Sequence, residues 1–569
     1  MSKWVSGKSP ALHDDRRSDN ALCAPPSSIG NAQNGVPVAN AIDGKTLLGV
    51  AALSVVLLSP SGLGVFGFDS AAFSYVAQVL QQGGVLYRDI WDNKQPGIYW
   101  FYQSVAQLIG NDWRALFIAS TLWNALTAIL ASIALMLALP GQRAAAWIPL
   151  LVIAILATRA NPEHLGQIEA LVSLPLMAIG VCALRLAQLF ERANDLPNNR
   201  DRQWWFEPAL LGLCAGLLTG VVISFKLLLA PLAVAVFCAP IVVRIIGVEW
   251  RHVPVLATVV SYLVGAAAIT AAIAVRFMLE GTFDLFWWTT IHYPLAALGA
   301  APLAPTARLF GSIWWLTVAI MPLAPLIVVA LVQGRRLFRG SVTPLTLLVL
   351  VWLAVGFVLI VAQRFSWWSY HFELLLWPLG LTAGIGAARL ASWRPPVPGW
   401  WPGPRAIVAA AIVLLGVQTA FAVRNMANPN WPIRSELRQS LATAAQVQTQ
   451  FARTLAGPSC GTGYVIGDPR LLVASGLRQA IATSGMSWWG AFLPAQMKRL
   501  PTQLAWTTPD YLYVSDDIRE HLQQLPELSQ FLSQHYRPVL TDATEGVWWQ
   551  RAAPLAVTGC RRDAGFTVP

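Results

Sequence analysis

The sequence predicts a multi-spanning α-helical membrane protein with about eleven transmembrane helices, followed by a small α/β domain outside the membrane. Two observations predict this fold class. The chain of 569 residues is 56% hydrophobic and only 12% charged, with 26 Trp, which is more apolar surface than a water-soluble core can bury. The apolar residues also gather in long runs of about one bilayer thickness, whereas the segment after residue 424 is far more polar.

The formal net charge of +11 indicates membrane topology rather than nucleic-acid binding, because Lys and Arg collect in loops that stay in the cytoplasm. Residues 1–43 are polar and rich in Pro, Ser and Asn, without the apolar run of a cleavable signal peptide. We expect a disordered cytoplasmic tail there. The predicted organisation is therefore a tail at 1–43, a transmembrane domain at 44–424 and an extracytoplasmic α/β domain at 425–569.

Eleven apolar runs are candidate spans. They lie near 46–66, 113–139, 145–158, 165–190, 207–224, 226–246, 253–275, 309–332, 343–362, 371–390 and 406–423. The run 145–158 is short, and the continuous stretch 207–246 is divided at Ser224–Lys226. With the N-terminus inside, the cytoplasmic connections contain Arg143, Arg192, Arg200, Arg202, Arg244, Arg251, Arg335, Arg336, Arg339, Arg389, Arg394 and Arg405, as the positive-inside rule expects. An odd number of spans places 425–569 outside.

The segment 425–569 alternates short β-like runs with helix-compatible stretches, which predicts a small α/β domain. The β-like runs are 463–467, 511–515 and 546–550, and the helical stretches are 471–483 and 518–536. Cys460 and Cys560 both fall in this segment. An oxidising compartment would allow them to form a disulfide, although two cysteines establish only the possibility of a bond and two unpaired thiols remain the alternative.

The loop between the first two spans, residues 66–110, carries several charges in a segment otherwise suited to a membrane surface. Apolar residues at helical spacing in Ser70–Leu80 and Pro96–Ile109 predict two amphipathic helices that lie flat in the outer membrane interface. Gly83–Gly84 can end the first helix, and Pro96 suits the first position of the second. The linker 87–94 then lies at the depth of the lipid head groups.

This arrangement suits a substrate with a lipid tail and a phosphate head group. The lipid chain would lie between the spans while Lys94, helped by Arg88, neutralises the phosphate. A carboxylate at the membrane rim could act as general base toward an acceptor hydroxyl. The sequence shows no Gly-rich loop for a nucleotide phosphate, as expected for a lipid-linked donor. These features predict a transferase that uses a lipid-phosphate donor.

The same loop resembles a known family. An Asp just outside the first span, a helix, and then GGVLYRDIWDNKQPGIYW resemble the first outer loop of the glycosyltransferase C (GT-C) superfamily, in the branch of the protein mannosyltransferases and the lipid A aminoarabinose transferase. The resemblance implies an inverting glycosyltransferase that moves a hexosyl or pentosyl group from a polyprenyl-phosphate donor. The implied acceptor is a hydroxyl of a glycan, lipid or protein on the outer face of the cytoplasmic membrane.

Some residue roles follow from the resemblance. Asp69 matches the first-loop Asp of the family, which implies the catalytic base, and Lys94 matches the Lys that contacts the donor phosphate in the aminoarabinose branch. Asn93 stands where that branch has a Glu, so no role or metal contact is implied for an acid there. Glu163 is the best match by location to the second acidic position of the family.

The remaining candidates come from the residues themselves. Asp89 and Asp92 are further catalytic candidates, and the candidates for the donor phosphate site are Lys94, Arg88, Lys226, Arg364 and His371. No metal or other cofactor is expected, because the spacing of His164, His292 and His371 matches no local ligand motif. The implied partners are the lipid-linked donor, its acceptor and membrane lipids, and no nucleic acid.

Several of these residues also have a purely structural interpretation. Asp69 could be only the N-cap of the helix that follows it. Asp89 and Asp92 could form a solvated turn with Arg88 and Lys94, because exposed ion pairs form easily and contribute little. Glu163 could lie in a solvated loop, and Lys226 could extend from a helix end toward the head groups.

A transporter or flippase of a lipid-linked or anionic solute is the main alternative function, because charged residues at span ends also mark transport paths. A non-catalytic lipid-binding scaffold is a third possibility. The charges favour the transferase, since they cluster in one outer loop and leave the middle of the spans almost uncharged.

The predicted bond between Cys460 and Cys560 can be tested by gel mobility with and without reductant. We expect a shift on reduction and no alkylation of either thiol beforehand, because a closed disulfide has no thiolate to react. An unchanged mobility together with two alkylatable thiols outside the membrane would refute the bond.

Overall fold

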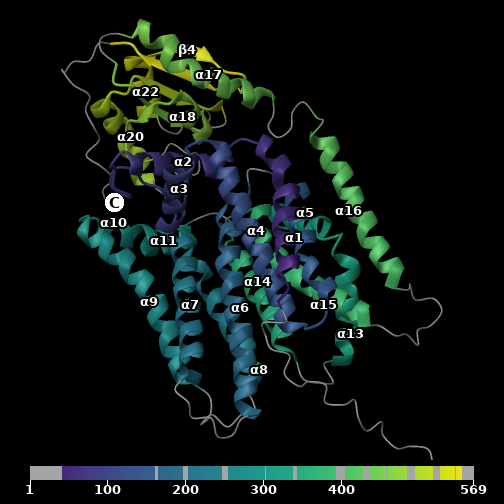
Figure 1. Ribbon diagram of the computed structural model, residues 1–569. Coiled ribbons are helices and arrows are strands. Elements are labelled where there is room, and N and C mark those ends of the chain that lie inside the picture. The colour runs from purple at the N-terminus through teal and green to yellow at the C-terminus, as the bar shows by residue number, and fades with distance from the viewer. Residues whose placement is uncertain are drawn as a thin grey trace, which may run out of the picture. The chain divides into compact units, whose positions relative to one another are not determined.

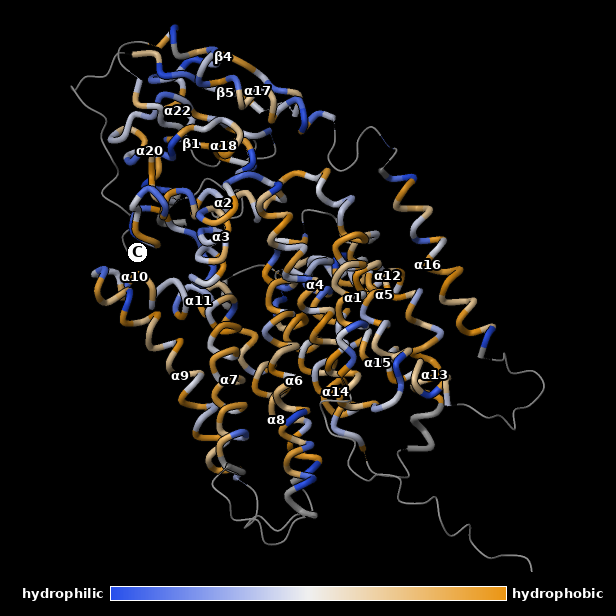
Figure 2. Tube along the Cα trace, viewed as in Figure 1, coloured by the Kyte–Doolittle hydropathy of each residue, from blue (hydrophilic) through white to orange (hydrophobic). Residues whose placement is uncertain are grey.

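The computed structural model describes residues 42–159, 164–195, 203–245, 254–300, 303–337, 342–364, 366–392, 404–426, 428, 435–455, 459–483, 494–516, 526–544 and 546–553. Within these ranges, nine helical segments are long and apolar enough to cross a membrane (Figures 1 and 2). They are α1 (Gly44–Leu58) with η2 (Ser59–Leu63), α4 (Trp113–Ala138), α6 (Ile168–Asp195), α7 (Gln203–Phe225), η5 (Leu227–Leu229) with α8 (Ala230–Ile245), α9 (Val255–Leu279), α14 (Pro344–Ala362), η8 (Ser369–Leu375) with α15 (Leu376–Ser392), and α16 (Pro404–Met426).

Two of the eleven predicted spans differ in the structure. The run 309–332 forms two helices, α12 (Thr306–Ala319) and α13 (Ala324–Leu337), that meet at 89°. Pro322 lies in the turn between them, and proline favours such a break because it has no backbone N–H to donate. The run 145–158 forms only η3 (Arg143–Trp147) and the short α5 (Pro149–Arg159). The described part therefore has nine spans, or ten if the bent pair is one.

The predicted division of the stretch 207–246 is confirmed. Helix α7 ends at Phe225, and Lys226 has extended backbone angles of φ −160° and ψ 101° before η5 begins. This break places a charged side chain at one end of two apolar helices rather than in the middle of one.

Helices α7 and α9 pack backbone against backbone through a row of glycines. Gly212, Gly216 and Gly220 occur every fourth residue and so lie on one face of α7. A Cβ atom at Gly212 or Gly216 would meet the carbonyl oxygen of Thr258 or Tyr262 on α9. Small residues at this spacing let membrane helices approach closely enough for extensive van der Waals contact.

The two predicted helices of the first loop are α2 (Phe68–Gln81) and α3 (Pro96–Leu108). As expected, Pro96 lies in the first turn of α3, and Gly83 follows α2 with a positive φ of 86°. However, α2 is buried over most of its surface, because α3 covers one side and α18 (Pro469–Ser475) of the C-terminal domain packs against it. Protein contacts therefore hold α2 in place.

The C-terminal domain is built on a five-stranded sheet in the order β2-β1-β3-β5-β4. Its elements are α17 (Ser435–Phe451), η9 (Ala452–Thr454), β1 (Thr462–Ile466), α18 (Pro469–Ser475), β2 (Arg478–Gln479), α20 (Pro494–Thr507), β3 (Tyr511–Val514), α22 (Pro526–His535), β4 (Tyr536–Thr541) and β5 (Val547–Arg551). Strand β1 pairs in parallel with β2 and β3, and β5 pairs antiparallel with β3 and β4. A small α/β domain is therefore confirmed.

The two faces of this sheet bury different clusters, as the alternation of side chains along a strand requires. Tyr464 and Leu512 belong to a separate apolar core with α20 and α22. Val465 and Tyr513 point the other way, into a cluster continuous with that of the membrane-spanning helices. The sheet therefore shares one of its cores with the transmembrane part.

The predicted helical stretch 471–483 is only partly correct. Helix α18 ends at Ser475 because Gly476 adopts the left-handed conformation, with φ 65°, and the chain then continues into β2. In the other predicted stretch, 518–536, α22 begins at Pro526, and residues 517–525 lie outside the described residues. Cys460 is disulfide-bonded, whereas Cys560 lies outside the described residues, so their pairing stays a prediction.

The substitution Gly216→Ala should lower the free energy of unfolding by about 1–3 kcal/mol, because the added methyl group forces α7 and α9 apart. Thermal unfolding in detergent, followed by scanning fluorimetry, measures the change. Gly311→Ala in α12 is the matched control, since a Cβ atom there meets nothing within 4 Å. Equal unfolding temperatures for the two variants would contradict the close packing of α7 and α9.

Candidate active site

A buried ion pair joins the start of α6 to the break between α7 and η5. It lies at the same end of the spans as α2 and α3. Glu169 lies in the first turn of α6, and Lys226 lies in the break between α7 and η5. Lys226 Nζ is 2.6 Å from Glu169 Oε1, and the two side chains are only 18% and 4% exposed. Lys226 also donates to Gln363 Oε1, at 2.6 Å, from the C-cap of α14. Lys226 is therefore held inside the protein and does not extend toward head groups.

The short helix η8 adds titratable side chains to this pair. His371 Nε2 is 3.8 Å from Glu169 Oε1, and His164 Nδ1 is 3.3 Å from Glu373 Oε1. His371 and Glu373 are both buried. Neither buried acid was among the candidates drawn from the sequence. Glu169 could have been found from its position, because an acid at the start of an apolar run is costly unless a cation faces it.

Asp69 lies beside this group, in the first turn of α2. The hydroxyl of Tyr370, the residue before His371, donates to Asp69 Oδ2 at 3.4 Å. The N-cap of α2 is Gly67, and no side chain caps the helix. The interpretation of Asp69 as only an N-cap is therefore wrong. Its half-buried carboxylate stands at the positive end of the α2 dipole, which favours a negative charge there.

Lys94 is held in position through the backbone of its own linker. Tyr87 donates its hydroxyl to Lys94 O at 2.7 Å, and the backbone N–H of Lys94 donates to the hydroxyl of Tyr99. Tyr87 has a positive φ of 67°, which is strained for an aromatic residue. Its buried ring stacks on Phe277 at the end of α9, with centroids 5.5 Å apart. This packing stabilises the strained backbone conformation of Tyr87 and orients the linker 87–94.

Two further segments hold the linker at Trp91. The Trp91 indole donates to Thr289 Oγ1 at 2.9 Å in η7 (Trp288–His292), a π-helical turn between α10 (Phe283–Trp287) and α11 (Tyr293–Ala300). The backbone N–H of Trp91 donates to Ala482 O in the C-terminal domain, also at 2.9 Å. The linker is thus fixed from the membrane-spanning side and from the sheet side.

Asp92 is buried, with 2% of its surface exposed. Its Oδ1 accepts the N–H of Asn93 at 2.6 Å, while Oδ2 has no hydrogen-bond partner among the described residues. Burial raises the pKa of the Asp92 carboxyl, and the Lys94 ammonium offsets part of that rise. The interpretation of Asp92 as part of a solvated turn is wrong. That interpretation is correct for Asp89, which forms an exposed ion pair with Arg88.

Two of the other predicted residues are exposed. Arg88 is 46% exposed and binds Asp89, and Arg364 is exposed in the loop after α14. Glu163 lies outside the described residues. Among the residues described, no group of three or more His, Cys, Asp or Glu is arranged to hold a metal ion. The predicted phosphate ligands Lys226 and His371, by contrast, both face Glu169 Oε1, at 2.6 and 3.8 Å, and the charges of Lys94 and Lys226 both act on the His371 imidazole.

The resulting charge cluster consists of two cations, two carboxylates and an imidazole: Lys94, Lys226, Asp69, Glu169 and His371. Its members come from α2, the following linker, α6, the α7–η5 break and η8. Cations of this kind can neutralise a phosphate, and a half-buried carboxylate can accept a proton. The cluster therefore contains the groups needed to transfer a group away from a phosphate ester.

Two crystal structures with a similar fold are both of ArnT from Cupriavidus metallidurans. The structure bound to undecaprenyl phosphate has a TM-score of 0.58 and 16% identity, over 90% of this chain and 98% of that one. The apo structure has a TM-score of 0.57 and 15% identity, over 92% and 100%. No protein-family model and no curated protein matches the chain. The likeness confirms the predicted fold, which is that of the two ArnT structures.

The buried pair Glu169–Lys226 can be tested by a double-mutant cycle with Glu169→Gln and Lys226→Met. Each single change should cost about 3–5 kcal/mol of unfolding free energy, because it leaves one buried charge unpaired. The double variant should recover about 1–3 kcal/mol of the summed loss. The free energy of unfolding in detergent is measured for the two single variants and the double variant.

The exposed pair Arg88–Asp89, which lies outside the spans, provides the control. A cycle with Arg88→Met and Asp89→Asn should give a coupling below about 1 kcal/mol, because water screens the charges. Strictly additive losses at Glu169 and Lys226 would show that the two charges do not stabilise each other.

Proposed function

We propose that this chain is an integral-membrane glycosyltransferase. It transfers a hexosyl or pentosyl group from a polyprenyl-phosphate donor to an acceptor hydroxyl on the outer face of the cytoplasmic membrane, with inversion at the anomeric carbon. The observation that carries the proposal is the charge cluster: Asp69 stands beside the partly buried cations Lys94 and Lys226 at one end of apolar, membrane-spanning helices.

The cations serve the donor. Lys94 is the main ligand of the donor phosphate, and Lys226 contributes its charge from within the cluster while it remains paired with Glu169. As the bond between sugar and phosphate breaks, negative charge accumulates on the leaving phosphate. Cations fixed in advance in a poorly solvated site stabilise that charge far better than the same cations would in water. The polyprenyl chain lies against the apolar helices.

Asp69 serves the acceptor. As the acceptor hydroxyl attacks the anomeric carbon from the side opposite the phosphate, Asp69 removes its proton. The hydrogen bond from Tyr370 holds the carboxylate in one orientation, so that little reorganisation is needed during the attack. An acceptor and a phosphate on opposite sides of the sugar give inversion, and their alignment supplies much of the rate.

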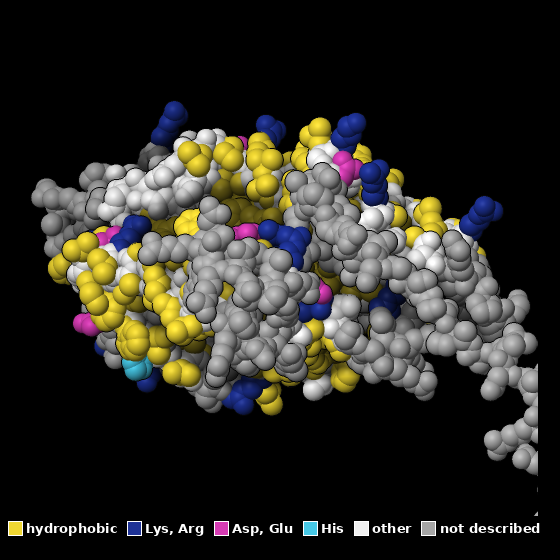
Figure 3. Space-filling model, turned by 60° about the horizontal axis from the view of Figure 1, so that its bottom comes forward, with side chains coloured by type: hydrophobic (Ala, Val, Ile, Leu, Met, Phe, Trp, Pro, Cys, Tyr) yellow, Lys and Arg dark blue, Asp and Glu magenta, His cyan; other side chains and the backbone are white. Residues whose placement is uncertain are grey.

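The distribution of arginines supports the proposed orientation. Arg192, Arg244 and Arg389 lie at the ends of α6, α8 and α15 that are remote from the charge cluster. Figure 3 shows Lys and Arg side chains projecting around this remote side of the molecule. By the positive-inside rule this distribution supports a cytoplasmic location for the remote side, and it therefore supports an outer location for the charge cluster and the C-terminal domain.

The similarity to ArnT supports a lipid-linked donor. ArnT has been crystallised with undecaprenyl phosphate, and this chain covers nearly the whole of that fold. The first-loop sequence around Lys94 resembles the same branch of the GT-C superfamily. We infer from both that the donor of this chain is also a polyprenyl phosphate.

The substitution Asp69→Asn should lower sugar transfer by at least about 100-fold, because the amide cannot accept the proton that a general base removes. Donor binding should remain within about twofold, since Lys94 and Lys226 are unchanged. Mass spectrometry of outer-surface glycans, lipids and proteins after expression measures transfer, and filter binding of radiolabelled undecaprenyl phosphate in detergent measures donor affinity.

The exposed Asp284 in α10 provides the control, since Asp284→Asn should alter neither value. A transporter, a flippase or a lipid-binding scaffold should tolerate the neutral isostere at position 69. Unchanged transfer in the Asp69→Asn variant would therefore eliminate the proposed mechanism, and so would the absence of any added sugar in the wild type.

A further inference from the structure

A polar cavity of about 290 Å³ lies between the first loop and the C-terminal domain, away from the charge cluster. One wall is the end of α2 with the turn after it, including Gln82, Gly83 and Arg88. The other wall is the start of β1 and the segment 478–482, which contains β2. This volume is at the small end of the range for ligand sites in proteins and suits one or two sugar rings.

The walls carry groups that bind a charged carbohydrate. Arg88 and Arg478 line opposite sides, and Asp89 is the single acid in the lining. Strand β2 is the edge strand of the sheet, and the backbone N–H of Gln479 donates to the hydroxyl of Tyr75 on α2. Gly83 contributes no side chain, and a Cβ atom there would enter open space. The cavity therefore combines two cations with many hydrogen-bonding groups.

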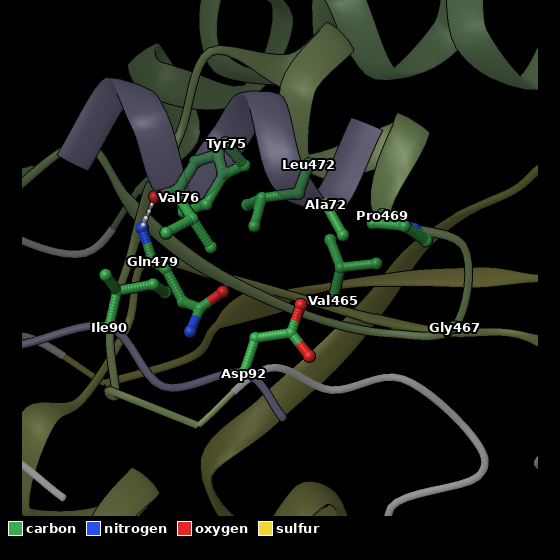
Figure 4. Close-up of a pocket in the computed structure, with 10 residues that line it drawn as sticks. All are labelled: Ala72, Tyr75, Val76, Ile90, Asp92, Val465, Gly467, Pro469, Leu472 and Gln479. Atoms are coloured by element: carbon green, nitrogen blue, oxygen red, sulfur yellow. Dashed lines mark hydrogen bonds between the residues drawn. The ribbon is translucent and has the colours of Figure 1, made fainter. Parts of the chain in front are cut away.

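Two buried polar atoms beside this cavity have no hydrogen-bond partner among the described residues. One is the hydroxyl of Thr462, a lining residue that is 5% exposed. The other is Oδ2 of Asp92, a residue that lines an adjoining space of about 20 Å³, enough for one water-sized group (Figure 4). Tyr75, Ile90 and Gln479 line both spaces, which therefore adjoin. Unpaired buried polar groups are rare and call for a partner.

The distance between the cavity and Asp69 suits the binding of an acceptor. Tyr75 follows Asp69 by six residues on α2, which is roughly 9 Å along the helix axis at 1.5 Å per residue. Gly83 lies about two further turns along the chain. A ligand in the cavity is therefore too far from Asp69 to react there itself. It is close enough to be one end of an acceptor whose other end reaches the base.

We propose that this cavity is an acceptor subsite that binds a carbohydrate unit carrying an anionic group. Arg478 is the main ligand of the anionic group, Arg88 adds its charge while it remains paired with Asp89, and the Thr462 hydroxyl binds a sugar hydroxyl. Asp92 Oδ2 accepts a hydrogen bond from a ligand hydroxyl or from a water between them. The inference rests on the proposed function, because only a transferase has an acceptor. Binding of the carbohydrate to the cavity does not itself require sugar transfer.

Binding of tetragalacturonate, a carbohydrate with a carboxylate on each ring, tests the proposal in the full-length chain reconstituted in nanodiscs. Microscale thermophoresis measures its affinity beside those of maltotetraose, the neutral counterpart, and inorganic phosphate. We expect tetragalacturonate to bind at least about tenfold more tightly than either. Arg478→Gln should weaken its binding about tenfold, because a charge-assisted hydrogen bond is lost, and Thr462→Val by a few fold.

Arg453→Gln is the matched control, because Arg453 is an exposed arginine of the same domain in η9, which lies near β5 at the other side of the sheet. It should leave the affinity unchanged. Equal affinities for tetragalacturonate and maltotetraose, or an affinity for inorganic phosphate as high as for tetragalacturonate, would overturn the proposal. Equal effects of Arg478→Gln and Arg453→Gln on the affinity for tetragalacturonate would also overturn it. Arg478 is exposed, so its replacement should not unfold the domain.

The two proposals fail separately. If tetragalacturonate binds as expected and no sugar transfer is found, the proposed function fails and the cavity assignment stands. If sugar transfer depends on Asp69 but tetragalacturonate does not bind, only the acceptor subsite is refuted.

Discussion

The ion pair between Glu169 and Lys226 is the interaction on which the rest of the site depends. Taking two charges out of water costs several kcal/mol per ion in real proteins, and the cost is recovered only with close, well-aligned contacts. The contact of 2.6 Å therefore requires α6 and the α7–η5 break to keep a fixed register. Gln363 adds the end of α14, and His371 approaches the same carboxylate from η8. Helix ends that are distant in sequence thereby form one wall.

The opposite wall is the linker between α2 and α3, and it is held by packing rather than by charge. Tyr87 adopts a positive φ, and its ring and hydroxyl hold the linker to α9 and to Lys94. Trp91 ties the linker to η7 and to the C-terminal domain. Such strain persists only where the surroundings determine the conformation. The C-terminal domain is thus part of the structure that positions Lys94, and the cavity of the acceptor subsite lies in the same junction.

Part of the site could be predicted because its signal is local. Asp69, Lys94 and the two helices of the first loop follow from periodicity, from proline and glycine positions and from the family motif within residues 66–100. Glu169 and Glu373 were missed, because each lies near the start of an apolar run, where an acid resembles an ordinary residue of a helix end. For Asp92 the sequence left both a catalytic role and a solvated turn open, since nothing in its neighbours along the chain shows that protein buries it from several sides. The helix predicted across β2 failed because Gly476 ends α18 and pairing with β1 makes Arg478 and Gln479 a strand.

The sequence by itself determined the membrane-spanning fold, nearly all of its helices and the α/β character of the C-terminal domain. These depend on hydrophobic length and periodicity, which are properties of continuous segments. Only the tertiary structure decided which charges meet, which acids are buried and which of the predicted phosphate ligands come together. A buried charge is stable only beside a partner, and the partners of Glu169 lie 57 and about 200 residues away along the chain. Their meeting is a property of helix packing and not of any single segment.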